Sequence, residues 1–312
     1  MERSGGGGYP HPIRPGETVV GWIGTGVMGA AMATRILAAG YSLAVYTRSP
    51  FKAAALVAAG ARLASSPADA SAGADVVFTM LGHPSDVRTV VLDPAFGALA
   101  ALPAGGVLVD HTSSQPALAR EIAAAALARS CWSIDAPVSG GDVGALEGKL
   151  AIFAGGDIAI IEWLGPLWGI LGKATAMGPP GTGQSSKIAN QIAVAGSILG
   201  LSEGLVFARA SGLDAGEFLA AIRGGAAGSA ALEIWGDRVR AVDDFPAGRF
   251  GEYMAKDLGM ALEDGGGSEE GSSPAVLPGA AICRQLFQAM AANGDGKLPF
   301  GLIALIERIS GK

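Results

Sequence analysis

The sequence predicts an α/β domain followed by an all-α domain. Between residues 18 and 178, short apolar segments with strand character alternate with longer Ala- and Leu-rich segments with helical character. This is the pattern of βαβ units built around a mostly parallel sheet. The segment GPPGTG at residues 178–183 interrupts the pattern, and the regular segments after it are all helical. A glycine-rich turn directly after the first apolar segment further supports the α/β assignment.

The expected elements follow one another in a regular order. Strands are expected at residues 18–23, 43–46, 76–80, 107–110, 132–135 and 150–153, with helices between them that include residues 28–39, 116–128 and 158–171. A long helix is expected at residues 184–210, followed by helices at residues 215–223, 230–241, 254–263, 280–291 and 301–309. We therefore expect a flexible tail at residues 1–17, a first domain at 18–180 and a helical domain at 181–312, with a polar loop at 264–274.

Composition excludes several classes of protein. Half of the 312 residues are hydrophobic, which excludes disorder over most of the chain. The net charge is −6 and no run of Lys or Arg stands out, which argues against a nucleic-acid partner. Two distant cysteines and three scattered histidines argue against a disulfide framework and a metal site.

The sequence also predicts the location of the protein. The uncharged stretch at residues 188–202 has 15 residues, fewer than the roughly 18–20 that a membrane span needs. Residues 1–17 contain neither the apolar segment of a signal peptide nor an Arg-rich amphipathic segment. We therefore expect no membrane association and a cytoplasmic protein.

The turn after the first strand has the spacing GxGxxG. In a strand–turn–helix setting, the first glycine permits a tight turn, the second lets backbone N–H groups approach a pyrophosphate, and the third allows close packing of helix on strand. The positive end of the helix adds to the attraction for phosphate. The sequence thus predicts a dinucleotide site formed by Gly24, Thr25, Gly26, Val27, Met28 and Gly29.

The end of the second strand predicts which dinucleotide binds. Sites for NAD usually carry an acidic residue there that binds the ribose hydroxyls, but this chain has Thr47, Arg48 and Ser49. An arginine can bind a 2′-phosphate, with the two hydroxyls as further donors. NADP(H) is therefore favoured, and NAD(H) stays open because Arg48 could equally be a surface residue.

The segment DAPVSGG at residues 135–141 offers a site for a small anion. Ser139 supplies a hydroxyl, and Gly140 and Gly141 leave several backbone N–H groups accessible, a combination suited to a carboxylate. The alternative is a long turn between two strands. A serine-hydrolase elbow is excluded, because Pro137 stands where the first glycine of that motif is required.

Lys187 is the candidate acid and base. It lies in the first turns of the expected long helix, where burial and the positive helix end both favour the neutral amine and should lower its pKa. Such a lysine suits proton exchange with a hydroxyl or carbonyl. Asn190 and Gln191, one turn further on, can reach the same region. The alternative is a lysine that extends to solvent at the domain boundary.

Two other features favour structural roles when taken alone. His83 and His111 follow strands in the expected first domain but have no acid or nucleophile at a suitable spacing. Lys256 and Asp257 form an ordinary pair on a helix surface.

The motifs together resemble a known family. GxGxMGxxM at residues 24–32, DHTS at 110–113, DAPVSGGxxGAxxGxL at 135–150, GTGQSSKIANQ at 181–191 and KDLGMAL at 256–262 occur in this order. The chain is similar to the β-hydroxyacid dehydrogenases, the group of 3-hydroxyisobutyrate dehydrogenase, tartronate semialdehyde reductase and glyoxylate/succinic semialdehyde reductase. Within this group it most resembles the plant proteins called 3-hydroxyisobutyrate dehydrogenase-like.

The resemblance implies a Rossmann domain, a long interdomain helix, and a helical domain that builds a homodimer or homotetramer. It implies hydride transfer between NADP(H) and a small hydroxy acid or semialdehyde, with Lys187 as the catalytic residue and Ser139, Gly140 and Gly141 around the substrate carboxylate. Residues implied near the nicotinamide and ribose are Met80, Leu81, Thr112, Ser113 and Lys256.

Two departures from the family pattern stand out. The family often has Asn four residues after the catalytic lysine, whereas this chain has Gln191 there and Asn190 before it. The stretch before Leu277 is also longer and richer in helix-breaking residues.

Two other functions stay open at this point. One is an imine reductase on the same scaffold, although such enzymes usually lack the lysine. The other is a non-catalytic cofactor-binding protein, although the chain retains Lys187, Ser139 and Lys256 together.

Overall fold

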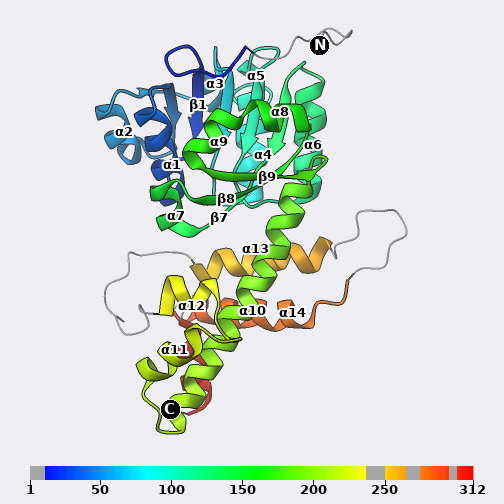
Figure 1. Cartoon of the computed structure of the whole chain (residues 1–312). Coiled ribbons are helices and arrows are strands. Elements are labelled where there is room, and N and C mark those ends of the chain that lie inside the picture. Colours follow the sequence, from blue (N-terminus) through cyan, green and yellow to red (C-terminus); the bar gives the residue numbers. More distant parts are fainter. Residues whose placement is uncertain (1–10, 237–249, 265–274, 295–300, 312) are drawn as a thin grey trace. The chain divides into compact units, whose positions relative to one another are not determined.

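The computed structural model describes residues 11–236, 250–264, 275–294 and 301–311 of the chain. The chain divides into two compact units, Met1–Lys187 and Ile188–Lys312 (Figure 1). The sequence predicted the division at residues 180 and 181. In the structure, the first residues of the long helix belong to the first unit.

Unit 1 is built around one sheet with the strand order β3-β2-β1-β4-β5-β6-β8-β7, and β9 also pairs with β8. The strands are β1 (Val19–Ile23), β2 (Ser42–Tyr46), β3 (Arg62–Leu63), β4 (Val76–Thr79), β5 (Val107–Asp110), β6 (Trp132–Asp135), β7 (Val138–Ser139), β8 (Leu150–Gly155) and β9 (Gly172–Gly178). Strands β1 to β6 are mutually parallel. Strand β8 runs antiparallel to β6 and β7. The strand order reverses at β1, between β2 and β4, and this is where doubly wound sheets bind ligands at the carboxyl ends of their strands.

Helices cover the sheet of unit 1 (Figure 1). They are α1 (Val27–Ala38), the 3-10 turn η1 (Pro50–Ala53), α2 (Ala54–Ala58), α3 (Pro67–Ser71), α4 (Pro84–Leu92), α5 (Ala98–Ala101), α6 (Pro116–Leu127), α7 (Gly141–Glu147), α8 (Ile158–Trp163) and α9 (Gly165–Leu171). Side chains of the central strands alternate between two buried cores, with Trp22 and Phe78 in one and Ile23 and Val77 in the other. Both faces of the sheet are therefore covered, which explains why its central strands read as continuous apolar runs.

The structure confirms the predicted strands, adds the strands β3, β7 and β9, and differs from the predictions at three further places. The helix expected at residues 158–171 is two helices, because Pro166 starts a new helix at the second residue of α9. The segment after Ser139 is the short helix α7 rather than an open turn. Part of the expected tail is attached to unit 1, since Ile13 is buried in a core of this unit and the His11 carbonyl accepts a hydrogen bond from Trp163.

Among the described residues of unit 2, the regular elements are all helices. Its elements are the remainder of α10 (Thr182–Ala210), α11 (Ala215–Arg223), α12 (Ala230–Trp235), α13 (Phe250–Asp264), α14 (Pro278–Ala292) and α15 (Gly301–Ile309). Ile198, Leu258 and Phe287 bring α10, α13 and α14 together in its main core. The end of the helix expected at residues 230–241 and most of the loop expected at 264–274 lie outside the described residues.

Helix α10 has 29 residues and is long and apolar enough, by length and composition, to cross a membrane. Core helices of proteins that fold in water also meet that criterion. The prediction that the protein does not associate with membranes therefore stays a prediction.

Each unit contains one buried cysteine, and neither forms a disulfide. Cys131 packs in a core of unit 1, and Cys283 packs in the main core of unit 2. Burial raises the pKa of both thiols above the usual value, so both are held in the unreactive thiol form.

Candidate active site

The glycine turn after β1 forms a cradle that fits a pyrophosphate. Gly24 has a φ of +102° and lies so close to Met80 that a Cβ would overlap the Met80 carbonyl oxygen. At Gly26 a Cβ would meet nothing within 4 Å, so this side of the loop is open for a ligand. The Thr25 hydroxyl is buried and has no hydrogen-bond partner in the described part of the chain. An open backbone and an unsatisfied buried hydroxyl are what a bound phosphate group would complete.

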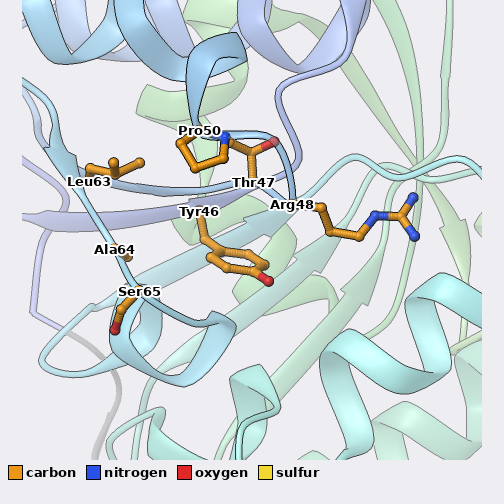
Figure 2. Close-up of a pocket in the computed structure, with 7 residues that line it drawn as sticks. All are labelled: Tyr46, Thr47, Arg48, Pro50, Leu63, Ala64 and Ser65. Atoms are coloured by element: carbon orange, nitrogen blue, oxygen red, sulfur yellow. The ribbon is translucent and has the colours of Figure 1, made fainter.

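A pocket lies beside the end of β2 (Figure 2). It has a volume of about 390 Å³ and is lined by Tyr46, Thr47, Arg48, Pro50, Leu63, Ala64 and Ser65. The Arg48 side chain is 78% exposed, and its guanidinium pairs with Asp86 of α4 at 3.1 Å. The predicted cofactor-selecting residues Thr47 and Arg48 thus line one pocket, whereas Ser49 only follows them in the chain.

The ends of β4 and β5 are joined by hydrogen bonds. The Leu81 N–H donates to the Thr112 hydroxyl at 2.9 Å, and the Thr112 N–H donates to Asp110 at 3.0 Å. The Thr79 hydroxyl also donates to Asp110, at 2.7 Å. Thr112 is almost fully buried, so its hydroxyl binds a backbone group of the protein. The neighbouring Met80 and Ser113 are partly exposed.

His111 is fully buried among aromatic rings. Its ring stacks on Phe78 at 5.3 Å and 5° and meets Trp168 edge to face. Its Nδ1 lies 2.6 Å from the Ala136 carbonyl oxygen, and burial lowers its pKa to about 4. These contacts agree with the structural role that the sequence favoured.

Two residues that the sequence reasoning did not single out attach the start of α10 to the sheet. Asp135, at the end of β6, accepts hydrogen bonds from the Gly181 and Gln184 N–H groups, both at 2.8 Å. Gln184 accepts a bond from the Ser114 N–H at 2.7 Å and donates one to the Thr112 carbonyl at 2.8 Å. Burial, with a contribution from Asp110, raises the pKa of Asp135 to about 7. The available signal in the sequence was an acidic residue at the end of an apolar strand. That this residue is buried becomes apparent only in the assembled sheet.

The predicted carboxylate-binding residues lie where β7 meets α7. Ser139 is partly exposed and pairs with Ala151 across the sheet. Gly140 and Gly141 have φ values of +134° and +65°, so the chain turns sharply at the start of α7. A Cβ on Gly141 would meet nothing within 4 Å, which leaves its backbone accessible.

Lys187 is the sixth residue of α10, and its side chain is only 8% exposed. It follows Gln184 by three residues, so it lies one turn beyond the hydrogen bonds that attach the helix to the sheet. The burial expected for this lysine is thus observed.

In unit 2, Gln191 is joined to residues of α13. Its side-chain amide donates to Asp257 at 2.8 Å and accepts from Asn190 at 3.0 Å. Asp257 is buried and pairs with Lys256 at 3.2 Å. The sequence had favoured a surface pair for Lys256 and Asp257 when taken alone, and it did not anticipate that Gln191 would bind Asp257. Among the described residues of the chain, no group of His, Cys, Asp or Glu could hold a metal ion.

The order of the sheet, the glycine cradle at its switch point and the pocket at the end of β2 define a nicotinamide-dinucleotide-binding protein of the oxidoreductase class. Residues 19–178 match the NAD-binding domain of 6-phosphogluconate dehydrogenase. Residues 181–304 match the NAD-binding domain of NADP-dependent 3-hydroxyisobutyrate dehydrogenase. The chain belongs to the 3-hydroxyisobutyrate dehydrogenase-like family of NAD(P)-dependent β-hydroxyacid dehydrogenases.

Relatives support this assignment over nearly the whole chain. Two Arabidopsis thaliana proteins named probable 3-hydroxyisobutyrate dehydrogenase-like 3 and 2, mitochondrial, are each 51% identical over 304 residues, which is 97% of this chain and 92% and 98% of theirs. The 2-hydroxy-3-oxopropionate reductase of Escherichia coli is 36% identical over 89% of this chain and 93% of its own. The solved structure of Mycobacterium tuberculosis 3-hydroxyisobutyrate dehydrogenase with L-serine has a TM-score of 0.79 and 28% identity, covering 93% of this chain and all but 1% of that one.

The names of the plant relatives contradict the predicted cytoplasmic location, because both proteins are described as mitochondrial. The prediction had relied on the absence of a recognisable targeting pattern in residues 1–17, and that inference was wrong.

Proposed function

We propose that the protein transfers a hydride reversibly between NADP(H) and a small hydroxy acid or its semialdehyde, with Lys187 as general acid and base. The observation that carries the proposal is the burial of Lys187 one turn beyond the hydrogen bonds that join α10 to the ends of β5 and β6. A buried amine on a fixed helix start is suited to proton exchange, because its direction and its protonation are both controlled by the protein.

The reaction needs one hydride and one proton. When bound, the nicotinamide cofactor supplies the hydride to the carbonyl carbon, or accepts it in the reverse direction. In reduction, Lys187 donates a proton from its ammonium group to the carbonyl oxygen, which becomes a hydroxyl, and the amine regains a proton from solvent. In oxidation, the neutral amine accepts the hydroxyl proton. Holding the reacting atoms at roughly 3–3.5 Å contributes much of the rate.

The remaining predicted residues bind and orient the two reactants. The Ser139 hydroxyl and the backbone N–H groups of Gly140 and Gly141 bind the substrate carboxylate. The sharp turn at these two glycines leaves their backbone accessible. Asn190 and Gln191 act on the substrate oxygen, Gln191 being held by Asp257. Around the nicotinamide and its ribose we propose Met80, Leu81, Thr112, Ser113 and Lys256, with Thr112 acting through its bond to Leu81.

NADP(H) is favoured over NAD(H) by the pocket at the end of β2. Arg48 stands at its rim beside Thr47, and no acidic residue lines it. A 2′-phosphate there would gain a charge-assisted hydrogen bond from the guanidinium, whereas an unmodified ribose would miss its usual acidic partner.

A kinetic panel tests the proposal. Glyoxylate, succinic semialdehyde, tartronate semialdehyde and 3-hydroxyisobutyrate are assayed with NADP(H) and NAD(H) in parallel, using the wild type, Lys187→Ala and the control Lys173→Ala, whose lysine is exposed on β9. We expect Lys187→Ala to lose most of kcat and to retain cofactor affinity, and the control to resemble wild type. Near wild-type turnover by Lys187→Ala would refute the role of this lysine.

The same panel tests the two other functions. Efficient reduction of preformed imines with no activity on the acids would favour an imine reductase. Tight NADPH binding without turnover of any compound would favour a non-catalytic protein.

We also propose that the protein is mitochondrial, as its plant relatives are named, and that it forms a homodimer or homotetramer. Within unit 2, helix α10 exposes the small residues Ala193, Gly196, Ser197 and Gly200 along one face, and small residues permit close approach of a second helix. Co-fractionation with mitochondria and light scattering of the purified protein test the two proposals.

A further inference from the structure

The first turn of α10 is joined to the sheet of unit 1 by side chains that are themselves buried. The two oxygens of Asp135 accept from two different backbone groups of this turn, Gly181 and Gln184, at 2.8 Å each. Asp135 is only 5% exposed. A buried carboxyl group is costly unless hydrogen bonds satisfy it, and these bonds come from N–H groups that the start of a helix leaves without intrahelical partners.

Gln184 makes the second half of the attachment. Its side chain is completely buried, and both ends of the amide are used. The carbonyl accepts from the Ser114 N–H at 2.7 Å and the amino group donates to the Thr112 carbonyl at 2.8 Å. Because Thr112 in turn holds the Leu81 N–H, Gln184 joins α10 to the segments that follow β4 and β5.

The backbones approach so closely here that no side chain lies between them. A Cβ on Gly183 would overlap the carbonyl oxygens of Asp135 and Phe153. A Cβ on Gly155 of β8 would lie 2.6 Å from the Gly183 nitrogen and 2.7 Å from an Asp135 carboxylate oxygen. The helix start therefore rests on the ends of β6 and β8 directly, with little freedom to shift or rotate.

We propose that Asp135 and Gln184 form a clamp that fixes the first turn of α10 and thereby positions Lys187 for proton transfer. Lys187 follows Gln184 by three residues, so a rotation or shift of the first turn moves the lysine with it. The clamp also fixes this turn relative to Leu81 and Thr112, two of the residues proposed near the nicotinamide. Asp135 and Gln184 are thus positioning residues. The inference rests on the proposed role of Lys187.

Two near-isosteric variants open the clamp. Asp135→Asn keeps one acceptor but turns an amino group toward a backbone N–H group, and Gln184→Met removes both side-chain bonds while keeping the length of the side chain. We expect each to lower kcat by roughly 10- to 100-fold, since a displacement on the order of 1 Å can cost about 100-fold in rate. The Kd for NADPH, measured by its fluorescence, should change by less than about twofold, because the glycine cradle is not altered.

Asp157→Ala is the matched control. Asp157 caps α8 in the same unit by accepting from the Ala159 and Ile160 N–H groups, and no residue proposed for the site lies on α8. Its loss should destabilise unit 1 as the loss of a helix cap does and leave kcat per NADPH-binding site unchanged. A fall in kcat in the control as large as in the clamp variants would show that the effect reflects stability alone and would overturn the proposal.

A double-mutant cycle tests whether the clamp acts through Lys187. In a Lys187→Ala background, Asp135→Asn or Gln184→Met should lower the residual rate no further. An additional loss equal to that seen with Lys187 present would overturn the proposal, as would wild-type kcat in both clamp variants alongside an inactive Lys187→Ala. Near wild-type turnover by Lys187→Ala would instead refute the proposed function. If Asp135→Asn does not fold, Gln184→Met carries the test.

Discussion

Two buried groups at the ends of β5 and β6 should make opposite contributions to the pH dependence of stability. His111 has its pKa lowered from 6.5 to about 4 by burial, and its Nε2 is buried with no hydrogen-bond partner in the described residues. As the pH falls below 6.5, His111 binds a proton in the unfolded chain but not in the folded chain. The stability due to His111 is therefore present above pH 6.5 and is lost as the pH falls toward 4.

Asp135 does the reverse. Burial and the neighbouring Asp110 raise its pKa from 3.8 to about 7, so between these values the folded chain holds a proton that the unfolded chain has lost. Its contribution is fully present below pH 3.8 and is lost as the pH rises through 7. One proton taken up or released changes the free energy of unfolding by about 1.4 kcal/mol per pH unit. The full effects are about 3 kcal/mol for His111 and about 4 kcal/mol for Asp135.

Between about pH 4 and pH 6.5, the contributions of His111 and Asp135 to the pH dependence of the unfolding free energy cancel in the wild type. Variants that remove one of the two groups should reveal each contribution. Relative to wild type, the unfolding free energy of Asp135→Asn should rise by about 3 kcal/mol across this range, and that of His111→Asn should fall by a similar amount. The double variant should again run parallel to wild type. Comparison with wild type removes the contribution of the other carboxyl groups.

Urea unfolding followed by tryptophan fluorescence measures these slopes. Trp22, Trp132, Trp163 and Trp168, four of the five tryptophans, belong to unit 1, so the signal reports mainly the unit that contains both groups. Parallel curves for Asp135→Asn and wild type would refute the reasoning, because they would mean that Asp135 is already ionised in the folded chain at pH 4.

Four further predictions concern the cofactor and the assembly. Arg48→Ala should lower kcat/KM for NADPH by roughly 10- to 100-fold, the energy of a charge-assisted bond to phosphate, and leave that for NADH within about twofold; a uniform loss with both cofactors would contradict the role of Arg48. Asp86→Asn releases the exposed Arg48 guanidinium from its ion pair and should strengthen NADPH binding by up to about fivefold, as expected for a surface pair; calorimetry measures it, and unchanged affinity would mean that the pair does not compete with phosphate. Gly26→Ala places a Cβ in open space, so the thermal midpoint should stay constant while the Kd for NADPH rises about tenfold or more; unimpaired binding would argue against the cradle. Gly200→Leu also places a side chain in open space and should reduce the proposed dimer or tetramer to monomers in light scattering, whereas an unchanged mass would exclude this face of α10 as the interface.

The sequence predicted the elements that have strong periodicity or distinctive turn chemistry. Strands β5 and β6 and helices α11 and α15 begin and end where they were expected, and the glycine turn lies at the switch point of the sheet. The short strand β7 and helix α7 were missed because two and seven residues carry too little periodicity. Strand β9 was missed because most of its residues are exposed and no apolar alternation marks it.

The candidate site was predictable where one residue type has one plausible role, as with the glycines and Lys187. It was not predictable where a role depends on contacts between distant segments. Asp135 and Gln184 are separated by 49 positions, and only the pairing of β6 with its neighbours brings the acid to the start of α10. Asp257 lies 66 positions from Gln191. The sequence around Lys256 and Asp257 is typical of a surface pair, but in the structure Asp257 is buried and accepts a hydrogen bond from the Gln191 amide.

The two buried cysteines give the molecule a built-in reporter of local opening. Each unit holds one thiol, nearly inaccessible and kept protonated by its burial, so a thiol reagent can label it only when that part of the chain opens. Labelling followed by peptide mass analysis would therefore measure how often each unit opens locally in the native enzyme, without an introduced probe. Cofactor that binds the cradle should slow the labelling of Cys131, and whether Cys283 slows as well would measure how strongly the opening of the two units is coupled.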